Sequence, residues 1–318
     1  TIAFIIKKFV ACKTPYEDEM GKCLIMQDDE EEKEVSLLGL NSAMLLALAE
    51  FTDATGGNKK YVKQAYEIAQ WIAGCQHTSK GGDNPRGSFA QKVIFDPLGA
   101  VDEFTEPYAE SRAVFAMARF INVMEKYHFT FRQEWKDIAY GGIKYLVKEA
   151  EKSTDDYSTD PFLLHSIAEL SMFHTADLQP FLEYSVRCSE LASKYQIRQS
   201  NGKRTDFVGS LVDDSSVTAS GAMSDGLCAV FKTLLLHDRK EEAHDVLNGA
   251  LLSVAYQLQS QYHPESAMYL ADPSRIIGGM HQSPDHLDMA IHDSQHNLNS
   301  FLCVASALEY TARSRITW

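Results

Sequence analysis

Apolar segments with helical spacing, joined alternately by long loops and short turns, run through this chain of 318 residues. No convincing pair of strands interrupts them. Long loops precede the segments that begin near Ser36, Glu106, Asp160, Ser220 and Asp285. Short turns follow most of these segments, and a short turn places the next helix antiparallel to the one before it. The pattern therefore predicts an all-α fold built from helix hairpins.

Start and stop signals set the expected helix ends. Asp160 followed by Pro161 is a strong start signal, because aspartate caps a helix and proline is tolerated in its first turn. Gly56 and Gly57 end the helix that begins at Ser36. The expected helices are residues 2–12, 36–55, 59–76, 106–127, 132–150, 160–173, 178–195, 220–236, 239–259 and 285–313.

The helices that follow long loops are more apolar than their hairpin partners. A helix that is apolar around most of its circumference belongs in the interior. We therefore expect residues 1–318 to form one domain, in which outer–inner hairpins close into a ring and all inner helices start on one face. The chain begins at Thr1 rather than Met, so we expect it to be excised from a longer chain, with an upstream domain as one partner.

Four segments resemble motifs of the α/α-toroid superfamily, which includes six-hairpin glycosidase-like and sugar epimerase-like proteins. Residues 53–65, DATGGNKKYVKQA, resemble its helix-turn-helix joint, and residues 106–120, EPYAESRAVFAMARF, resemble its YPGEALLALARL inner helix. Residues 160–170, DPFLLHSIAEL, are similar to its DHWLLYALNEL helix without the His and Trp, and the stretch from Gly278 to Leu298 resembles its closing GGF…D..QHNLSAL segment. The resemblance implies an (α/α) toroid of about five to six hairpins, a fold shared by glycoside hydrolases, sugar epimerases, polysaccharide lyases and terpenoid cyclases.

Net charge, cysteine spacing and missing motifs limit the partners and cofactors that we expect for this chain. The formal net charge of -14 disfavours nucleic acid and anionic membranes, and no apolar run reaches the length of a membrane span. Six cysteines occur singly, without CxxC spacing, and are expected to be buried thiols in a reducing, cytoplasmic compartment. No signal peptide and no phosphate-binding or dinucleotide-binding motif occurs, so no cofactor is expected.

Carboxylates at the starts of inner helices are the first candidates for catalysis. Hydrolysis of a glycosidic bond needs one protonated carboxyl and one carboxylate across the substrate. Asp160, Asp225 and Glu110 come from different inner helices and are predicted to supply them. Each also has a structural interpretation, with Asp160 as a helix cap, Glu110 in an ion pair with Arg112, and Asp225 as the buttress of a loop.

The densest polar stretch, from Gly278 to Leu302, forms the entry to the last inner helix. Asp293 and His296 are three residues apart and could be a carboxylate–imidazole pair that binds or polarises a sugar. Asp288, His292 and His296 recur every four residues, which is an alternative metal-ligand spacing, although no HExxH motif supports it. The remaining expected substrate-binding residues are Arg112, Asp214, His281, His286 and Gln295.

Three functions follow from these residues. The leading hypothesis is a glycoside hydrolase acting on a carbohydrate or another small polar substrate. The second is a sugar epimerase or polysaccharide lyase, in which Tyr108 or His296 abstracts a proton beside an acidic group neutralised by Arg112. The third is a non-catalytic toroid that serves as a binding or regulatory module. The sequence leaves the substrate itself open.

Overall fold

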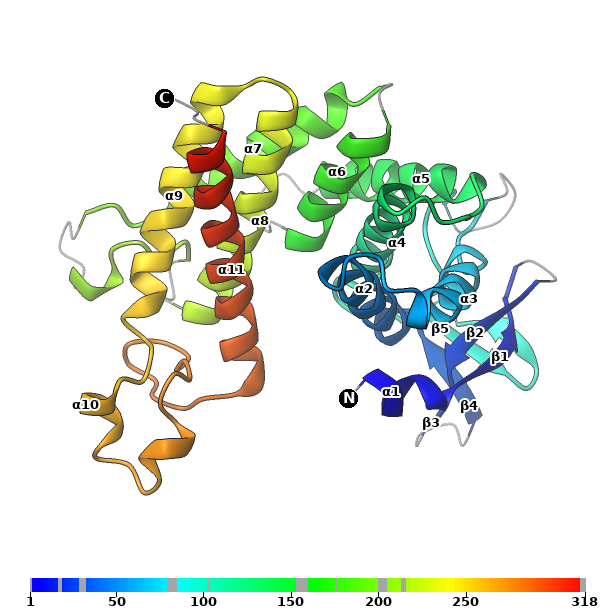
Figure 1. The fold of residues 1–318 in the computed structure, drawn as a ribbon, viewed down its shortest axis with the longest axis horizontal. Coiled ribbons are helices and arrows are strands. Elements are labelled where there is room, and N and C mark those ends of the chain that lie inside the picture. The colour runs from blue at the N-terminus through cyan, green and yellow to red at the C-terminus, as the bar shows by residue number, and fades with distance from the viewer. Residues whose placement is uncertain are drawn as a thin grey trace. The chain divides into compact units, whose positions relative to one another are not determined.

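The protein is described by a computed structural model covering residues 2–16, 19–28, 33–78, 85–101, 103–152, 160–174, 177–199, 205–212 and 216–314. It is mostly α-helical and divides into two compact units (Figure 1). The first unit comprises Thr1–Asp156 and Glu169–Ala176, and the second comprises Tyr157–Ala168 and Asp177–Trp318. The expectation of one closed ring over the whole chain stays a prediction. No described helix is long and apolar enough to cross a membrane.

The expected hairpin helices are confirmed, with small shifts at their ends. The first unit contains α2 (Leu38–Ala54), α3 (Val62–Ala73), α4 (Ala109–Lys126) and α5 (Glu134–Ala150). Helix α6 (Pro161–Phe173) crosses the boundary, and α7 (Gln179–Tyr195), α8 (Val217–Leu236), α9 (Lys240–Leu258) and α11 (Ile291–Arg313) follow in the second unit. The shorter helices are α1 (Ile2–Ile5), η1 (Ile6–Lys8), η2 (Lys59–Tyr61), η3 (Thr205–Phe207), α10 (Pro264–Ala267) and η4 (Pro273–Arg275).

Two small antiparallel sheets in the first unit show that the strand-free expectation is wrong. The expected helix over residues 2–12 ends early, and β1 (Phe9–Lys13) pairs with β2 (Met20–Leu24). The second sheet has the order β3-β4-β5-β6, from β3 (Met26–Asp28), β4 (Lys33–Leu37), β5 (Lys92–Phe95) and β6 (Leu98–Ala100). Strands this short carry too few alternations to be told from loops by periodicity.

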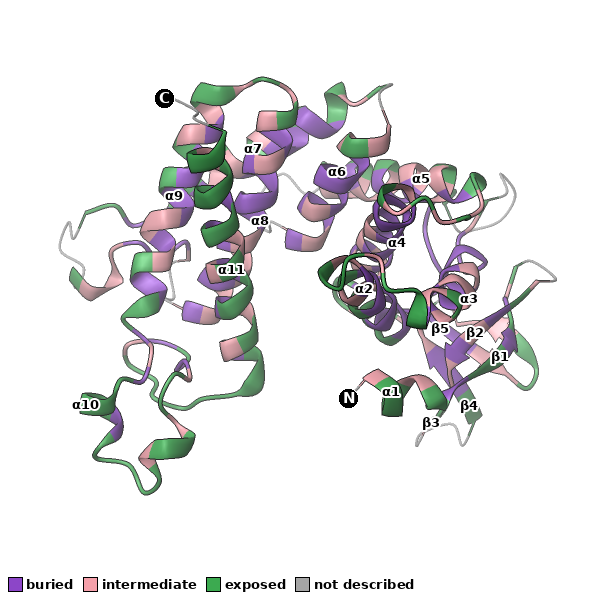
Figure 2. Cartoon of the chain, in the orientation of Figure 1, coloured by how far each residue is buried: buried purple, intermediate pink, exposed green. Residues whose placement is uncertain are grey.

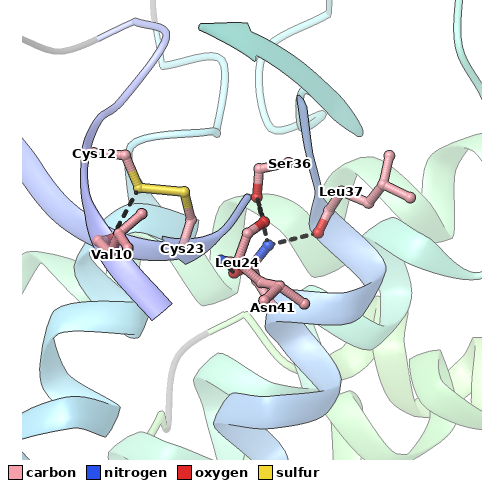
Figure 3. The surroundings of a disulfide bond; sticks show 7 residues. All are labelled: Val10, Cys12, Cys23, Leu24, Ser36, Leu37 and Asn41. Carbon is pink, nitrogen blue, oxygen red and sulfur yellow. Dashed lines mark hydrogen bonds between the residues drawn. A yellow bond between two sulfur atoms is a disulfide. The ribbon is translucent and has the colours of Figure 1, made fainter. Parts of the chain in front are cut away.

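A disulfide joins Cys12 and Cys23 across β1 and β2, with their Cα atoms 6.4 Å apart (Figure 3). The expectation that all six cysteines are free thiols is therefore wrong for this pair. Both lie on the same face of the ribbon, because Cys12 is opposite Gly21 and Cys23 is opposite Val10. Their spacing in the sequence matches no recognised motif, so pattern alone could not have found them.

Asn41, in the first turn of α2, ties that helix to two strands (Figure 3). Its amide nitrogen donates to the Leu37 carbonyl at 2.6 Å and to the Ser36 hydroxyl at 2.9 Å. Its amide oxygen accepts from the Leu24 backbone N–H at 2.9 Å, and Ser36 donates to the Leu24 carbonyl. Asn41 is fully buried, so each of these bonds replaces one to water.

Replacing Asn41 with leucine is expected to lower the free energy of unfolding by about 2 kcal/mol, because it leaves the half-buried Leu24 N–H without its acceptor while keeping side-chain volume. Urea unfolding followed by circular dichroism measures the change. A midpoint equal to that of the unaltered protein would contradict the bonding seen around Asn41.

The turn after α2 is held by a charged network with α4. Asp53 accepts hydrogen bonds from Lys126 at 2.6 Å, Arg119 at 2.6 Å and Tyr127 at 2.9 Å, and Arg119 also pairs with Glu50. Burial by itself would raise the pKa of Asp53, but these hydrogen bonds outweigh it and lower the pKa from 3.8 to about 2. The ionised carboxylate therefore stabilises the joint that resembles the toroid turn.

The Asp53→Asn variant is expected to lose about 1–2 kcal/mol of stability at pH 7, after allowance for solvent screening of the partly exposed partners. A carboxyl whose pKa is lowered on folding contributes stability above its unfolded pKa of 3.8 and loses it as the pH falls towards about 2. The difference between the two proteins should thus shrink below pH 4. Urea midpoints from pH 7 to pH 3 test this, with the exposed Asp137→Asn as the control; a gap that does not depend on pH would contradict it.

The loop after α3 closes through a two-residue bridge. The His77 N–H donates to the Ser88 carbonyl at 2.9 Å, and the Gly87 N–H donates to the His77 carbonyl at 2.9 Å. Gly87 has a φ of +100°, which a residue with a Cβ rarely adopts. The Gln76 side chain spans the bridge, since its amide donates to the Gly87 carbonyl and to the Ile138 carbonyl of α5.

The loop after α7 closes in the same way. Ile197 and Ser210 form the first bond at 2.9 Å, and Gly209 donates back to Ile197 at 2.7 Å. Gly209 has a φ of +105°. The Gln196 amide reaches the Gly249 carbonyl in α9 at 2.8 Å, as Gln76 reaches α5. The chain therefore repeats one joint in two hairpins, each with a glutamine before the first bonded residue and a Gly-Ser pair at the return of the loop.

A third copy follows α9. The Tyr262 N–H donates to the Gly279 carbonyl at 2.9 Å, and the Gly278 N–H donates to the Tyr262 carbonyl at 2.8 Å, with a φ of +88° at Gly278. Gln261 donates to the Gly278 carbonyl at 3.2 Å. Between Tyr262 and Gly278 the chain makes a longer excursion that contains α10 and η4.

Each returning loop is then anchored on the long helix that follows it. A backbone N–H just after the bridge donates to Glu110 in α4 at 2.7 Å, to Ser220 in α8 at 3.2 Å and to Ser294 in α11 at 3.3 Å. These three residues therefore occupy equivalent positions. The equivalence aligns α4, α8 and α11 residue by residue.

Candidate functional site

Glu110 in the first turn of α4 is a buried loop anchor. Its carboxylate accepts the Phe89 N–H, and burial raises its pKa against the opposing effect of hydrogen bonds from Phe89 and Gln91. Ser220 and Ser294 do the same anchoring work in the other repeats without a carboxyl group. The structure thus assigns Glu110 a structural role, and its predicted catalytic role stays a prediction.

Arg112 and Tyr108 lie beside Glu110 at the start of α4. Arg112 is 3.5 Å from the carboxylate of Glu106, which fills the space over Gly39. Tyr108 is 45% exposed and has a φ of +62°, a left-handed conformation that costs a bulky residue about 1–2 kcal/mol. Helix α4 begins one residue later, at Ala109, and not at Glu106 as expected.

Asp160 in the second unit caps α6. One carboxylate oxygen accepts the Phe162 N–H at 2.9 Å and the Leu163 N–H at 3.2 Å. The structural interpretation of Asp160 is therefore confirmed. One turn further along α6, His165 lies 3.2 Å from Asp225 of α8, with both side chains 19% exposed.

This imidazole–carboxylate pair includes one predicted residue, Asp225, and one that sequence reasoning missed, His165. The thiols of Cys228 and Cys303 lie beside this pair. A hydrogen bond from Cys228 lowers the pKa of Cys303, and the nearby His165 lowers it further. The signal for His165 was its place one turn after the Asp160 cap in an expected inner helix. Neither of the two cavities described below includes this pair.

Asp293, in the first turn of α11, connects that helix to α8. Its carboxylate accepts the Thr218 hydroxyl at 2.5 Å and the Ala290 N–H at 2.7 Å, and lies 3.2 Å from the His292 imidazole. The observed imidazole neighbour of Asp293 is therefore His292, whereas the sequence pointed to His296. His296 is half-buried and Gln295 is exposed.

The alternative metal spacing does not hold. Helix α11 begins at Ile291, so Asp288 lies in the preceding loop and is not one helical turn from His292. Within the described ranges, no group of three His, Cys, Asp or Glu residues is placed to hold a metal ion. His286 is exposed in the same loop, and Asp214 lies outside the described residues.

The long excursion of the third joint builds a cavity of about 480 Å³. That volume falls within the range of about 300–1,000 Å³ typical of small-molecule pockets. Its walls combine aromatic rings, imidazoles and amides with one carboxylate. They are Gln259, Gln261, Tyr262, His263, Glu265, Ser266, Tyr269, Leu270, His281 and Leu287.

His281 is the best-defined proton acceptor in this pocket. Its Nδ1 lies 2.7 Å from the Ser283 carbonyl, and because a carbonyl only accepts, Nδ1 carries the proton. The other nitrogen, Nε2, then keeps its lone pair. Burial lowers the pKa of His281 from 6.5, so the imidazole is neutral at pH 7.

Tyr262 holds the His281 ring in place. The two rings meet edge to face with centroids 5.4 Å apart, and the Tyr262 hydroxyl donates to the Leu287 carbonyl. The sequence predicted His281 as a substrate-binding residue. It gave no signal for Tyr262, Glu265 or Tyr269, since their loop has no recognisable motif.

A second cavity of about 450 Å³ lies between α7, α8 and α9. Charges of both signs line it, including Glu190, Lys194, Arg198 and Glu242. No histidine or aromatic ring lies among its walls, so it has no neutral base and no surface on which a sugar ring could stack. The pocket around His281 is therefore the better candidate for chemistry.

No family model and no curated protein matches the chain. Among solved structures, the fold is similar to that of a sugar epimerase from a ruminal bacterium, with a TM-score of 0.51 and 11% identity. The similarity covers 97% of this chain and 83% of that chain. At this identity the likeness establishes a shared helical fold, which agrees with the expected class.

Proposed function

We propose that the protein is a carbohydrate-processing enzyme that epimerises or isomerises a sugar in the pocket around His281. The observation that carries the proposal is a neutral imidazole with a fixed tautomer in a cavity of suitable size. Such a group suits removal of a proton from carbon at neutral pH. The shared fold with a sugar epimerase supports this choice of class over hydrolysis.

The chemistry assigns a separate part to each pocket residue. His281 Nε2 takes the proton from the carbon next to the carbonyl of an open-chain sugar. The C–H electron pair forms a carbon–carbon double bond while the carbonyl π pair moves to the oxygen, which gives an enediolate. His263, which lines the same pocket, returns a proton to that carbon or its neighbour. The exposed ring of Tyr269 offers a stacking surface for the sugar, and Gln259 and Gln261 offer amide hydrogen bonds.

Glycoside hydrolysis is the second candidate, and Glu110 favours it. A general acid must keep its proton near neutral pH, and burial raises the pKa of this carboxyl. Glu106 supplies another carboxylate at the same end of α4. We also propose that all the helix hairpins close into one toroid.

Incubation in D₂O with a panel of aldoses and ketoses tests the proposal. Proton NMR should show loss of the signal from the carbon beside the carbonyl, as solvent deuterium replaces it, together with a new epimer or isomer. New reducing ends from oligosaccharides, without any exchange, would instead establish hydrolysis. The absence of both reactions would overturn the proposal in favour of a non-catalytic module.

A further inference from the structure

Helices α8 and α11 run parallel and close together within the second unit. A Cβ added at Gly221 of α8 would lie 3.0 Å from the Asn297 amide oxygen of α11. One turn further along both helices, the Ser300 hydroxyl donates to the Ser224 hydroxyl at 3.0 Å. Because these contacts advance in the same direction along both helices, the next turns face each other as well.

That next turn carries a cysteine on each helix. Cys228 follows Ser224 by four residues, and Cys303 follows Ser300 by three, so both stay on the facing sides. Both are free thiols, and a hydrogen bond joins their side chains. Cys228 is 3% exposed and belongs to the largely buried α8 (Figure 2). Side-chain rotation can therefore bring the two sulfur atoms to the S–S bonding distance of about 2.05 Å.

The His165–Asp225 pair lies beside these thiols. Helix α6 packs on α8, since a Cβ added at Gly226 would lie 3.1 Å from the Leu164 side chain. His165 follows Leu164 in α6 and lies 3.2 Å from Asp225 of α8. It is also close enough to Cys303 to favour the thiolate form of that residue. The cysteines, the histidine and the aspartate all belong to the second unit.

The two thiols differ in how readily they ionise. The hydrogen bond from Cys228 lowers the pKa of Cys303 below its ordinary value of 9.0. Burial and Asp225 act against this lowering of the pKa, whereas His165 and Lys232 add to it. The same hydrogen bond, together with burial, raises the pKa of Cys228 well above 9.0. The pair therefore combines a thiol that favours the nucleophilic thiolate with a neighbour that keeps its proton.

We propose that Cys303 and Cys228 form a peroxide-reactive dithiol, in which Cys303 is oxidised first and Cys228 then closes a reversible disulfide between α11 and α8. The Cys303 sulfur forms a bond to one oxygen of hydrogen peroxide as the O–O bond breaks. The leaving hydroxide takes up the proton that the thiol has given up. The sulfur is thereby oxidised to a sulfenic acid, and the peroxide is reduced to water.

The second step uses the neighbouring thiol. The Cys228 sulfur attacks the Cys303 sulfur, the S–O bond breaks, and the hydroxyl group leaves with the Cys228 proton as a second water molecule. The product is a disulfide, which a dithiol reductant returns to the starting pair. The proposal does not depend on the function proposed for the His281 pocket.

Tryptic peptide mapping of the unaltered protein after brief exposure to hydrogen peroxide at pH 7 tests the disulfide. The remaining free thiols are then blocked with N-ethylmaleimide, so that no exchange occurs during digestion. Trypsin releases Cys228 in residues 205–232 and Cys303 in residues 276–313. The two peptides should appear as one linked species that dithiothreitol separates. The absence of this linked species, with or without loss of the free thiols, overturns the proposal.

Cys188 of α7 is the matched control within the same unit. Burial raises the pKa of its thiol to about 11, whereas the pKa of Cys303 lies below 9.0. The thiolate fraction at pH 7 should therefore be at least about 100-fold larger at Cys303. Since intrinsic nucleophilicity falls with the pKa, Cys303 should be oxidised roughly 10-fold faster than Cys188. Equal oxidation rates at the two thiols overturn the proposal.

Two serine variants test the order of the steps. In Cys228→Ser the oxidation should stop at the sulfenic acid of Cys303, which dimedone labels. Cys303→Ser should lose this labelling, because the raised pKa of Cys228 keeps that thiol protonated. Dimedone on Cys228, or none on Cys303 in Cys228→Ser, overturns the proposal. The peptide map needs no variant, so it decides the disulfide even where a serine variant fails to fold.

Discussion

Replacing His281 with asparagine is expected to reduce deuterium exchange into the sugar by about 10²–10⁴-fold, the contribution typical of one general base. Asparagine can still donate a hydrogen bond to the Ser283 carbonyl but has no lone pair comparable to Nε2. Substrate binding should weaken far less, because the pocket keeps its other walls. Rate and KM measured separately by NMR distinguish these effects.

The pH dependence gives an independent readout for the same group. Burial lowers the pKa of His281, so the base is unprotonated down to a pH below 6.5. The exchange rate should rise with pH through that lowered pKa and then level off, and this limb should vanish in the asparagine variant. The control is His237→Asn, which should keep the full profile. His237 follows the C-terminal end of α8, whereas the loop that contains His281 is bonded to Val217 at the N-terminal end of that helix. A rising limb that survives in His281→Asn would exclude His281 as the base.

Sequence reasoning succeeded where the signal is long and periodic. The helices from 36 to 259 were found because each carries several turns of apolar spacing and a local stop such as Gly56. The strands were missed because pairs such as Val35 with Ile94 join distant segments of a few residues each. The repeated joint was missed although each copy has a glutamine before the loop and a Gly-Ser or Gly-Gly pair after it, because the loops between them differ in length.

The catalytic roles predicted at the helix starts stay predictions for a related reason. Asp160, Glu110 and Asp293 stand at helix starts, where free N–H groups attract carboxylates whether or not a reaction occurs there. The same helix-start rule therefore selects caps and anchors as readily as catalysts. His281 became distinctive only through the Ser283 carbonyl and the walls of its pocket, which no local spacing encodes.

Replacing Gly209 with alanine is expected to destabilise the second unit by about 3–5 kcal/mol. The new Cβ would lie 2.3 Å from the Leu252 carbonyl and 2.7 Å from the Tyr256 Cβ, both on α9. The φ of +105° adds a conformational penalty, because residues with a Cβ rarely adopt it. The loop must move off α9, which breaks the Gln196 bond to Gly249 that closes the joint.

Gly278→Ala is the matched control, because it occupies the equivalent position with a φ of +88° and open space around its Cβ. Its cost should be about 1–2 kcal/mol, from the left-handed backbone alone. Urea unfolding of both variants at pH 7 measures the two costs directly. The excess at Gly209 measures the energetic effect of α9 packing closely against the joint, so equal costs would contradict that close contact.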